Sequence, residues 1–395
     1  MGFKITDTVT WVGKIHWELK TFHGEEYSTH KGSSYNSYLI RDEKTVLIDT
    51  VWQPFGREFI ENLKKEIDLK EIDYIILNHA EPDHSGALPE LMREIPNTPI
   101  YCTKNGVKTI KGHYHENWNF VEVKTGDTLD IGKNKLIFVE ARMLHWPDTM
   151  FTYLTNENIL FSNDAFGQHY ASELMYNDLV DQCELFAEAT KYYANILTPF
   201  SQLVLKKIEE VLSFNLPVNM ICPSHGIVWR ENPTQIIHKY LEWAKAYQEN
   251  QITIIYDSMW GGTRRMAEGI AEGINARDSG ITVKIFNSAK SDKNDIITEV
   301  FKSKAILVGS STINKGILHS VAGILEMIKG LEFKNKKAVA FGSYGWSGES
   351  PKIIKMELEK SGFQVVGDGL RELWNPDEDA YNRCVEFGKE LIKNI

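Results

Sequence analysis

The spacing of hydrophobic and polar residues changes character once along the chain, near residue 250. Before that point, short apolar or alternating runs are separated by polar turns, as in "KTVLIDT", "KLIFVEA", "NILFSND" and "VNMICPSHG". Such runs predict buried strands, and "WELKTF" (17–22) predicts another near the start. Apolar residues at three- and four-residue spacing predict helices over 56–67, 179–212 and 233–250. The first part therefore reads as mixed α/β with many short strands.

From "ITIIYDS" (252–258) onward, strands and helices alternate strictly. The helical stretch 263–276 follows that strand, and "ITVKIFN", "AILVGSS" and "KAVAFGSYG" then alternate with further helices. This alternation is typical of a doubly wound parallel sheet. We therefore expect two domains, residues 1–250 and residues 251–395.

The composition of the chain argues against several classes of protein. The 395 residues are 42% hydrophobic and 25% charged, with a formal net charge of −10, so neither nucleic acid nor a membrane surface is an expected partner. The four cysteines lie far apart, which favours reduced thiols and excludes an internal iron–sulfur or rubredoxin-type centre. No signal-peptide core or membrane-length apolar run is present, so we expect a cytoplasmic protein.

Candidate metal ligands cluster in "NHAEPDHSG" (78–86), directly after a predicted buried strand. Similar residues follow three other predicted strands. Side chains at neighbouring strand ends share one rim of a sheet, which is where loops converge to build sites. The candidate ligands are His79, Glu81, Asp83, His84, His145, Asp164 and His225.

Four imidazoles and three carboxylates are enough for two metal ions with one bridging carboxylate. Structural zinc favours clustered thiolates, and the single cysteine close to these positions, Cys222, lies within a predicted buried strand. Glu81 adds a hard oxygen donor to the imidazoles, a mixture that suits iron or manganese. The residues therefore favour a redox-active iron pair over a hydrolytic zinc pair.

"HAEPDHSG", with the three later ligands, resembles the H-x-H-x-D-H motif of the metallo-β-lactamase fold. Glu81 in place of the second histidine is similar to the flavodiiron proteins (A-type flavoproteins). The resemblance implies an αββα sandwich followed by a flavodoxin-like domain. It also implies that His79, Glu81 and His145 bind one iron, that Asp83, His84 and His225 bind the other, and that Asp164 bridges them.

Three loops in the second part can hold a flavin. Each follows a parallel strand, at the edge where open sheets bind ligands, and the first opens a helix whose N-terminus suits a phosphate. The loops resemble those of short-chain flavodoxins, and this resemblance implies FMN. The candidate residues are Ser258, Met259, Trp260, Gly261, Gly262, Thr263, Ser310, Ser311, Thr312, Asn314, Ser343, Tyr344, Gly345, Trp346 and Ser347.

The resemblance implies an oxidoreductase that reduces O2 to water, NO to N2O, or both, at the di-iron site with electrons from FMN. It further implies a head-to-tail homodimer or a dimer of such dimers. No internal donor centre is expected, so electrons would come from a separate rubredoxin-like protein or a reduced deazaflavin cofactor. Four residues are candidates for lining the substrate pocket or donating protons: His23, Trp146, His169 and Tyr193.

Two other interpretations remain open at this stage. One is a dizinc hydrolase of the metallo-β-lactamase type, fused to a flavodoxin-like domain that docks a partner. The other is an electron carrier or scaffold whose metal site is vestigial. Glu81 argues against the first and the complete ligand set against the second; metal content and the visible spectrum would separate all three.

Overall fold

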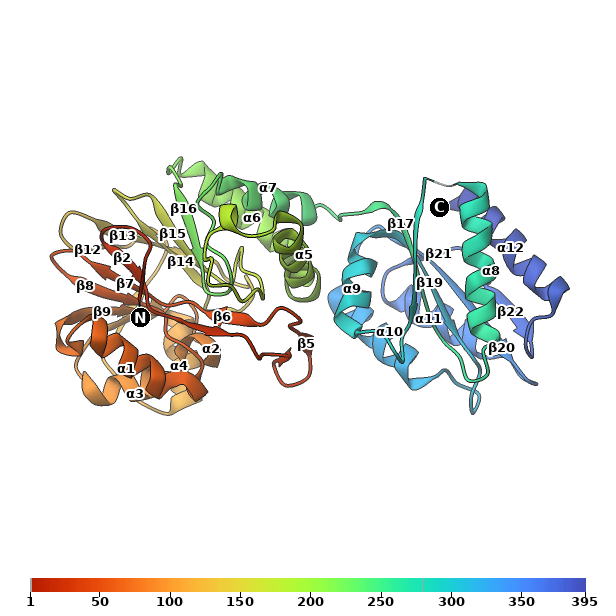
Figure 1. The fold of residues 1–395 in the computed structure, drawn as a ribbon, viewed down its shortest axis with the longest axis horizontal. Helices are drawn as coiled ribbons and strands as arrows, with labels where there is room; N and C mark the ends of the chain where they lie inside the picture. Colours follow the sequence, from red (N-terminus) through yellow and green to blue (C-terminus); the bar gives the residue numbers. More distant parts are fainter. Residues whose placement is uncertain (1, 279) are drawn as a thin grey trace. The chain divides into compact units, whose positions relative to one another are not determined.

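The computed structural model describes residues 2–278 and 280–395 (Figure 1). The chain forms two compact units. The first comprises the chain up to Tyr192 together with Phe200–Glu242, and the second comprises Tyr193–Pro199 and Trp243–Ile395. Over the two described ranges, no helix combines the length and the apolar character that crossing a bilayer requires.

The first unit is built on two sheets. The larger sheet contains, in spatial order, β1 (Phe3–Lys4), β2 (Val9–Trp11), β7 (Tyr38–Arg41), β8 (Thr45–Ile48), β9 (Ile72–Ile76), β10 (Ile100–Thr103) and β11 (Phe120–Val123). The smaller sheet contains β12 (Thr128–Asp130), β13 (Lys135–Glu140), β14 (Met150–Leu154), β15 (Ile159–Asn163) and β16 (Met220–Pro223). The two sheets pack face to face.

Successive residues of one strand enter different cores, because side chains alternate across a sheet. Ile76 packs between the sheets with Phe138 and Phe161, whereas Ile75 packs against the helices on the outer face. Those helices are α1 (Gly56–Glu66), α3 (Leu88–Glu94) and α4 (Lys104–Tyr114). α6 (Ser201–Ser213) and α7 (Thr234–Trp243) contact the outer face of the smaller sheet, beside α5 (Gln182–Tyr192) (Figure 1). The predicted αββα sandwich is confirmed.

Several predicted elements differ in detail. Only Thr21–Phe22 (β4) of the strand expected over 17–22 forms, paired with β5 (Tyr27–Ser28), while β3 (Lys14–His16) pairs with β6 (Ser33–Tyr35). The helix expected over 233–250 ends at Trp243. The helix expected over 179–212 is interrupted by a π-helical turn, η4 (Tyr193–Leu197), and a 3-10 turn, η5 (Thr198–Phe200). Pro199 explains the second break, because it has no N–H for the helical ladder.

The second unit has one parallel sheet. Its order is β18 (Thr282–Asn287), β17 (Glu249–Asp257), β19 (Ser303–Ser310) and β20 (Lys337–Tyr344), with β21 (Gln364–Val365) and β22 (Leu370–Leu373) both pairing with β20. This is the 2-1-3-4-5 order of flavodoxin-like sheets. α8 (Gly262–Arg277) and α12 (Glu378–Leu391) pack together on one face, and α9 (Lys293–Lys302), α10 (His319–Leu331) and α11 (Ser350–Lys360) lie on the other (Figure 1). The predicted doubly wound sheet is confirmed.

Candidate metal centre and cofactor cavity

All seven candidate ligands meet at one rim of the sandwich in the first unit. They follow the ends of β9, β13, β15 and β16, and two of them lie on α2 (Pro82–Ser85), a helix that begins with a proline at its first position. Their ligand atoms form two groups, within each of which the atoms lie no more than 4.8 Å apart: His79, Glu81, His145 and Asp164, and Asp83, His84 and His225. Six of the seven are buried, and His145 is half-buried.

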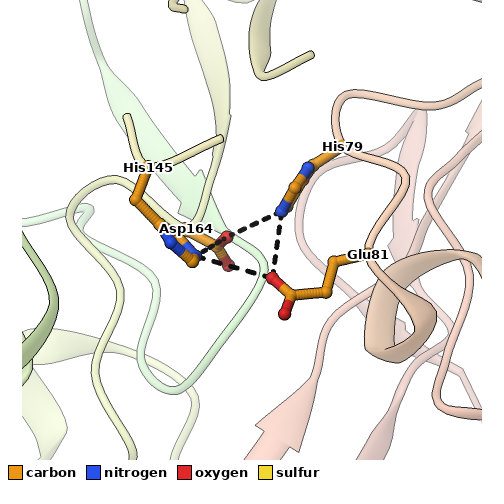
Figure 2. A group of neighbouring side chains, drawn as sticks. All are labelled: His79, Glu81, His145 and Asp164. Carbon is orange, nitrogen blue, oxygen red and sulfur yellow. Dashed lines mark hydrogen bonds and ion pairs between the residues drawn. The ribbon is translucent and has the colours of Figure 1, made fainter. Parts of the chain in front are cut away.

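Figure 2 shows the first group, in which two imidazoles and two carboxylates face a common point. The Nε2 atom of His79 lies 3.1 Å from Oε2 of Glu81 and 3.7 Å from Oδ2 of Asp164. The Nε2 atom of His145 lies 3.5 Å and 3.3 Å from the same two oxygens. Ligand atoms about 2.0–2.2 Å from a metal stand roughly 3–3.5 Å from one another, so these spacings suit a metal ion.

The second group shares Asp164 with the first. The Nε2 atoms of His84 and His225 both lie 3.0 Å from Oδ2 of Asp83. They also lie 2.9 Å and 3.5 Å from Oδ1 of Asp164. One oxygen of Asp164 therefore faces each group, which is the geometry that a bridging carboxylate requires.

Partners outside the two groups orient the imidazoles. Nδ1 of His79 lies 3.0 Å from Oδ2 of Asp148, which also accepts a hydrogen bond from the backbone N–H of Ala80. Nδ1 of His225 donates to the carbonyl oxygen of Ser34 at 2.7 Å. With Nδ1 engaged, each Nε2 presents its lone pair to the site. Asp148 was not predicted from the sequence, where its one signal is its place three residues after His145.

The shifted pKa values of the site favour cations at its centre. Burial opposes ionisation of His79, yet Asp148 and Glu81 raise the pKa of His79 to about 10. Burial likewise opposes ionisation of Glu81, but His23 and His79 lower the pKa of Glu81 to about 2. Metal ions would replace the protons on these imidazoles.

Unsatisfied atoms support the same conclusion. Within the described residues, Oδ1 of Asp83, Nε2 of His84 and Oδ2 of Asp164 are buried and have no partner with hydrogen-bond geometry. Buried polar atoms normally have partners, so three such atoms on the candidate ligands fit the binding of metal ions. The donor set therefore fits two metal ions of the iron type.

Three of the four residues proposed for the substrate pocket lie at this site. Nε2 of His23 is 3.0 Å from Oε1 of Glu81, and the ring of Trp146 is 5.2 Å from that of His79. His169 is buried, with its ring 5.1 Å from that of His225. Tyr193 was placed wrongly.

The ring of Tyr193 packs instead on Trp243 and Phe301 in the second unit, at centroid distances of 5.4 and 5.7 Å. The π-helical turn that begins at Tyr193 explains the error, because neighbouring residues point to different sides of a helix. Its neighbour Tyr192 lies at the metal centre, with its ring 5.1 Å from His169. Burial, with the nearby Asp164, holds the pKa of Tyr192 well above its ordinary value.

The second unit has a cavity of about 610 Å³ at the carboxyl edge of its sheet, where the three candidate flavin loops meet. Eleven of the fifteen residues predicted to bind the cofactor line it: Met259, Trp260, Gly262, Ser311, Thr312, Asn314, Ser343, Tyr344, Gly345, Trp346 and Ser347. The other four, Ser258, Gly261, Thr263 and Ser310, belong to the same loops but do not line the cavity. The hydroxyl of Thr263 lies 3.0 Å from that of Ser311 and 2.8 Å from that of Ser343, beneath the cavity floor.

The cavity fits a phosphorylated aromatic cofactor. The first N–H groups of α8 open onto the loop that begins at Ser258, whose buried hydroxyl has no partner within the described residues. A Cβ added to Gly262 would stand 3.0 Å from the Ser343 hydroxyl, so the backbone of this loop approaches the floor closely. The exposed rings of Trp260 and Trp346 flank the opening.

Sequence reasoning missed three residues that line the cavity: Lys315, Trp374 and Asn375. Trp374 and Asn375 follow β22, and the rule that ligands bind beyond the carboxyl ends of parallel strands would have found them. Lys315 lies in the same loop as the predicted Asn314 and directly follows it.

Comparison with known proteins agrees with the fold of both units. Residues 34–226 match the family described as ODP family beta lactamase, and residues 254–388 match the flavodoxin family. The chain is 58% identical over 395 residues to the anaerobic nitric oxide reductase flavorubredoxin of Escherichia coli, covering all of this chain and 82% of that protein.

Two solved structures are similar over the whole chain. Rubredoxin oxygen:oxidoreductase from the anaerobe Desulfovibrio gigas is 38% identical with a TM-score of 0.96, and the alignment covers 100% of this chain and 98% of that one. The flavodiiron protein from Giardia intestinalis is 34% identical with a TM-score of 0.94, covering 100% and 96%. The chain is therefore an oxidoreductase that belongs to the flavodiiron protein family.

Proposed function

We propose that this protein reduces nitric oxide to nitrous oxide at a di-iron centre in residues 1–250, with electrons from FMN bound in residues 251–395. The observation that carries the proposal is the pair of ligand groups sharing Asp164 in a chain that is 58% identical to anaerobic nitric oxide reductase flavorubredoxin. The reaction consumes two NO, two electrons and two protons, and yields N2O and water. A reduced flavin carries the two electrons.

Each iron has its own set of residues in this proposal. His79, Glu81 and His145 hold one ion, and Asp83, His84 and His225 hold the other. Asp164 offers one oxygen to each, and Oδ1 also accepts a hydrogen bond from the Ser224 hydroxyl at 2.9 Å. When bound, the iron pair supplies a binding place and electrons for the diatomic substrate, and FMN supplies the electrons that restore it.

The surrounding residues contribute orientation, exclusion of water and protons. Asp148 and the Ser34 carbonyl keep the imidazoles of His79 and His225 turned toward the metals. His23 reaches the site from a partly exposed position, with 31% of its side chain accessible, and contacts Oε1 of Glu81. We propose His23 as the group that passes protons from solvent to the buried centre.

We propose a head-to-tail homodimer, in which the flavin of one subunit serves the metal centre of the other. Electron transfer needs near contact, and the two cofactors belong to different domains of one chain. Electrons reach the flavin from a separate rubredoxin-like protein or a reduced deazaflavin. If turnover per chain stayed constant while dilution separated the subunits, the dimer proposal would fail.

The function is tested with protein reconstituted with iron and FMN under anaerobic conditions. We expect about two irons and one FMN per chain, loss of NO at an electrode, and N2O by gas chromatography. Asp164→Asn should abolish N2O formation, while Asp130→Asn, an exposed carboxylate in the same unit, should not. Two bound zinc ions with hydrolytic turnover and no consumption of NO would contradict the proposal.

Reduction of O2 to water is the second candidate, because the similar Desulfovibrio gigas protein is named as an oxygen oxidoreductase. It requires four electrons and four protons per O2, twice the demand of two NO. Anaerobic single turnover of the fully reduced protein with each gas compares the two reactions directly. Faster oxidation by NO, with an intact iron centre afterwards, is the result expected if NO is the substrate.

A further inference from the structure

One turn beside the cofactor cavity has an unfavourable backbone conformation. Asn314 and Lys315 both have positive φ, 49° and 60°. The flanking residues exchange both backbone hydrogen bonds, from Ile313 N to Gly316 O at 3.2 Å and from Gly316 N to Ile313 O at 2.7 Å. This is the form of a tight turn with two left-handed central residues, which favours Asn followed by Gly. A lysine in the second central position is strained, because its Cβ disfavours this conformation.

The strained residue carries a charge, and it lines the cavity. Among the fourteen described residues that line it, Lys315 is the one charged side chain, and none is acidic. The chain as a whole has a net charge of −10, so a cation here is not a consequence of composition. Lys315 itself is exposed and makes no ion pair within the described residues. Backbone strain at a ligand site is a reason to look for a function of the side chain that causes it.

We propose that Lys315 tunes the reduction potential of the bound flavin by placing its ammonium group beside the isoalloxazine ring. This inference rests on the flavin assignment proposed above. Oxidised flavin has a neutral ring, and it takes up two electrons and one proton to give a ring with one negative charge. A nearby cation favours the charged form, so it binds reduced flavin more tightly than oxidised flavin and raises the potential.

The position of Lys315 favours the ring over the phosphate. The phosphate is expected at the first N–H groups of α8, above the hydroxyls of Thr263, Ser311 and Ser343, which contact one another. Lys315 lies beyond this cluster, in an exposed turn four residues after Ser311. Its neighbour Asn314 also lines the cavity, so both central residues of the turn present polar groups to the ligand.

The test measures the potential of flavin bound to the full chain, by reduction in the presence of a reference dye and with flavin absorbance as the readout. Lys315→Gln removes the charge, Lys315→Arg keeps it, and Lys315→Gly removes the charge while relieving the turn. Lys290→Gln is the matched control, because Lys290 is an exposed lysine after β18 that does not line the cavity. Each variant is loaded once with FMN and once with riboflavin, which has no phosphate.

We expect Lys315→Gln and Lys315→Gly to lose about tenfold in the preference for reduced over oxidised flavin, which corresponds to a two-electron potential about 30 mV lower. The shift should be the same with riboflavin, and Lys315→Arg and Lys290→Gln should keep the potential of the parent protein. Because Lys315→Gly relieves the turn, it should also raise the unfolding free energy of the flavin-free protein. Measuring that unfolding transition also shows that the variant is folded.

Two results would overturn the inference. One is an unchanged potential in Lys315→Gln, and the other is weaker binding of FMN, but not of riboflavin, which would assign Lys315 to the phosphate. In both cases the protein still binds flavin and the proposed function stands. If the parent protein itself binds neither flavin, the proposed function fails instead.

Discussion

At the scale of single residues, Asp148 determines which way the imidazole of His79 faces. Its Oδ2 accepts hydrogen bonds from the His79 ring and from the backbone N–H of Ala80, so the carboxylate joins a ligand to the loop that carries it. Carboxylates in this position hold the tautomer of a metal-binding histidine and increase its basicity.

Asp148→Asn is expected to weaken metal binding at the group that contains His79 by roughly 10- to 100-fold, because the amide neither carries charge nor fixes the tautomer. The measurement is a competition titration against a chelator of known affinity, with metal content read by mass spectrometry. Asp130→Asn is the control, since Asp130 is exposed in the same unit. Equal affinities in the two variants would contradict the role given to Asp148.

The sequence predicted that His84 is a metal ligand but not how its imidazole is oriented. Its place in "HAEPDHSG" suggested a ligand, but only the structure shows its Nε2 2.9 Å from Oδ1 of Asp164 and 3.0 Å from Oδ2 of Asp83. α2, a helix of only four residues, presents Asp83 and His84 together to the site. The orientation depends on that short helix, and sequence periodicity is too coarse to predict one turn.

At the scale of elements, a buried lysine, Lys336, directly precedes β20. Lys336 donates three hydrogen bonds from Nζ, to the carbonyl oxygens of Tyr247, Phe301 and Ser303 at 2.9, 2.7 and 2.6 Å. These bonds connect the residue before β20 to Tyr247 and to the segment 301–303, both in the second unit. Burial lowers the pKa of Lys336 from 10.5 to about 7, with a smaller opposing effect of Glu249.

The lowered pKa of Lys336 predicts a pH dependence of stability. Between pH 7 and 10.5 the unfolded lysine is protonated and the folded one is largely neutral, so the unfolded state binds more protons and stability rises with pH. Below pH 7 both states are protonated, and the full cost of burying the charge is present. Relative to Lys336→Met, the unfolding free energy of the parent protein should rise from pH 7 to 9 by at most about 1.4 kcal/mol per pH unit.

Denaturant titrations at several pH values measure this difference. Lys337→Met is the matched control, because Lys337 is the next residue and, within the described residues, its Nζ donates to the exposed carbonyl oxygen of Asn394. The variant Lys336→Met should be less stable throughout, since the carbonyl oxygens lose a donor that has three N–H groups when protonated and two when neutral. Parallel curves for the parent and Lys336→Met would show that the pKa of Lys336 is not lowered.

At the scale of the whole molecule, the two compact units carry separate sites. Anything that binds only the folded state stabilises it, so each cofactor should stabilise the unit that holds it. Calorimetry of the complete protein should therefore resolve two transitions. Chelation of the metals should lower one transition temperature and removal of flavin the other, whereas a single transition that shifts on either treatment would show that the units unfold together.

Much of this arrangement was determined by the sequence. The change of hydrophobic pattern near residue 250 predicted two fold types, and both are present. The candidate metal ligands were recognisable because imidazoles and carboxylates followed several buried strands, and parallel strand ends meet at one edge. The flavin loops were recognisable for the same reason, with most of their residues lining the cavity.

The tertiary structure alone decided which side chains meet across long distances in the chain. Asp148 became a partner of His79, and Tyr192 rather than Tyr193 reached the metal centre. Trp374 joined a cavity formed mainly by loops more than 25 residues earlier in the chain. Periodicity along a chain records which face of an element is apolar. It carries no information on contacts made through space, which follow from how strands order and helices end.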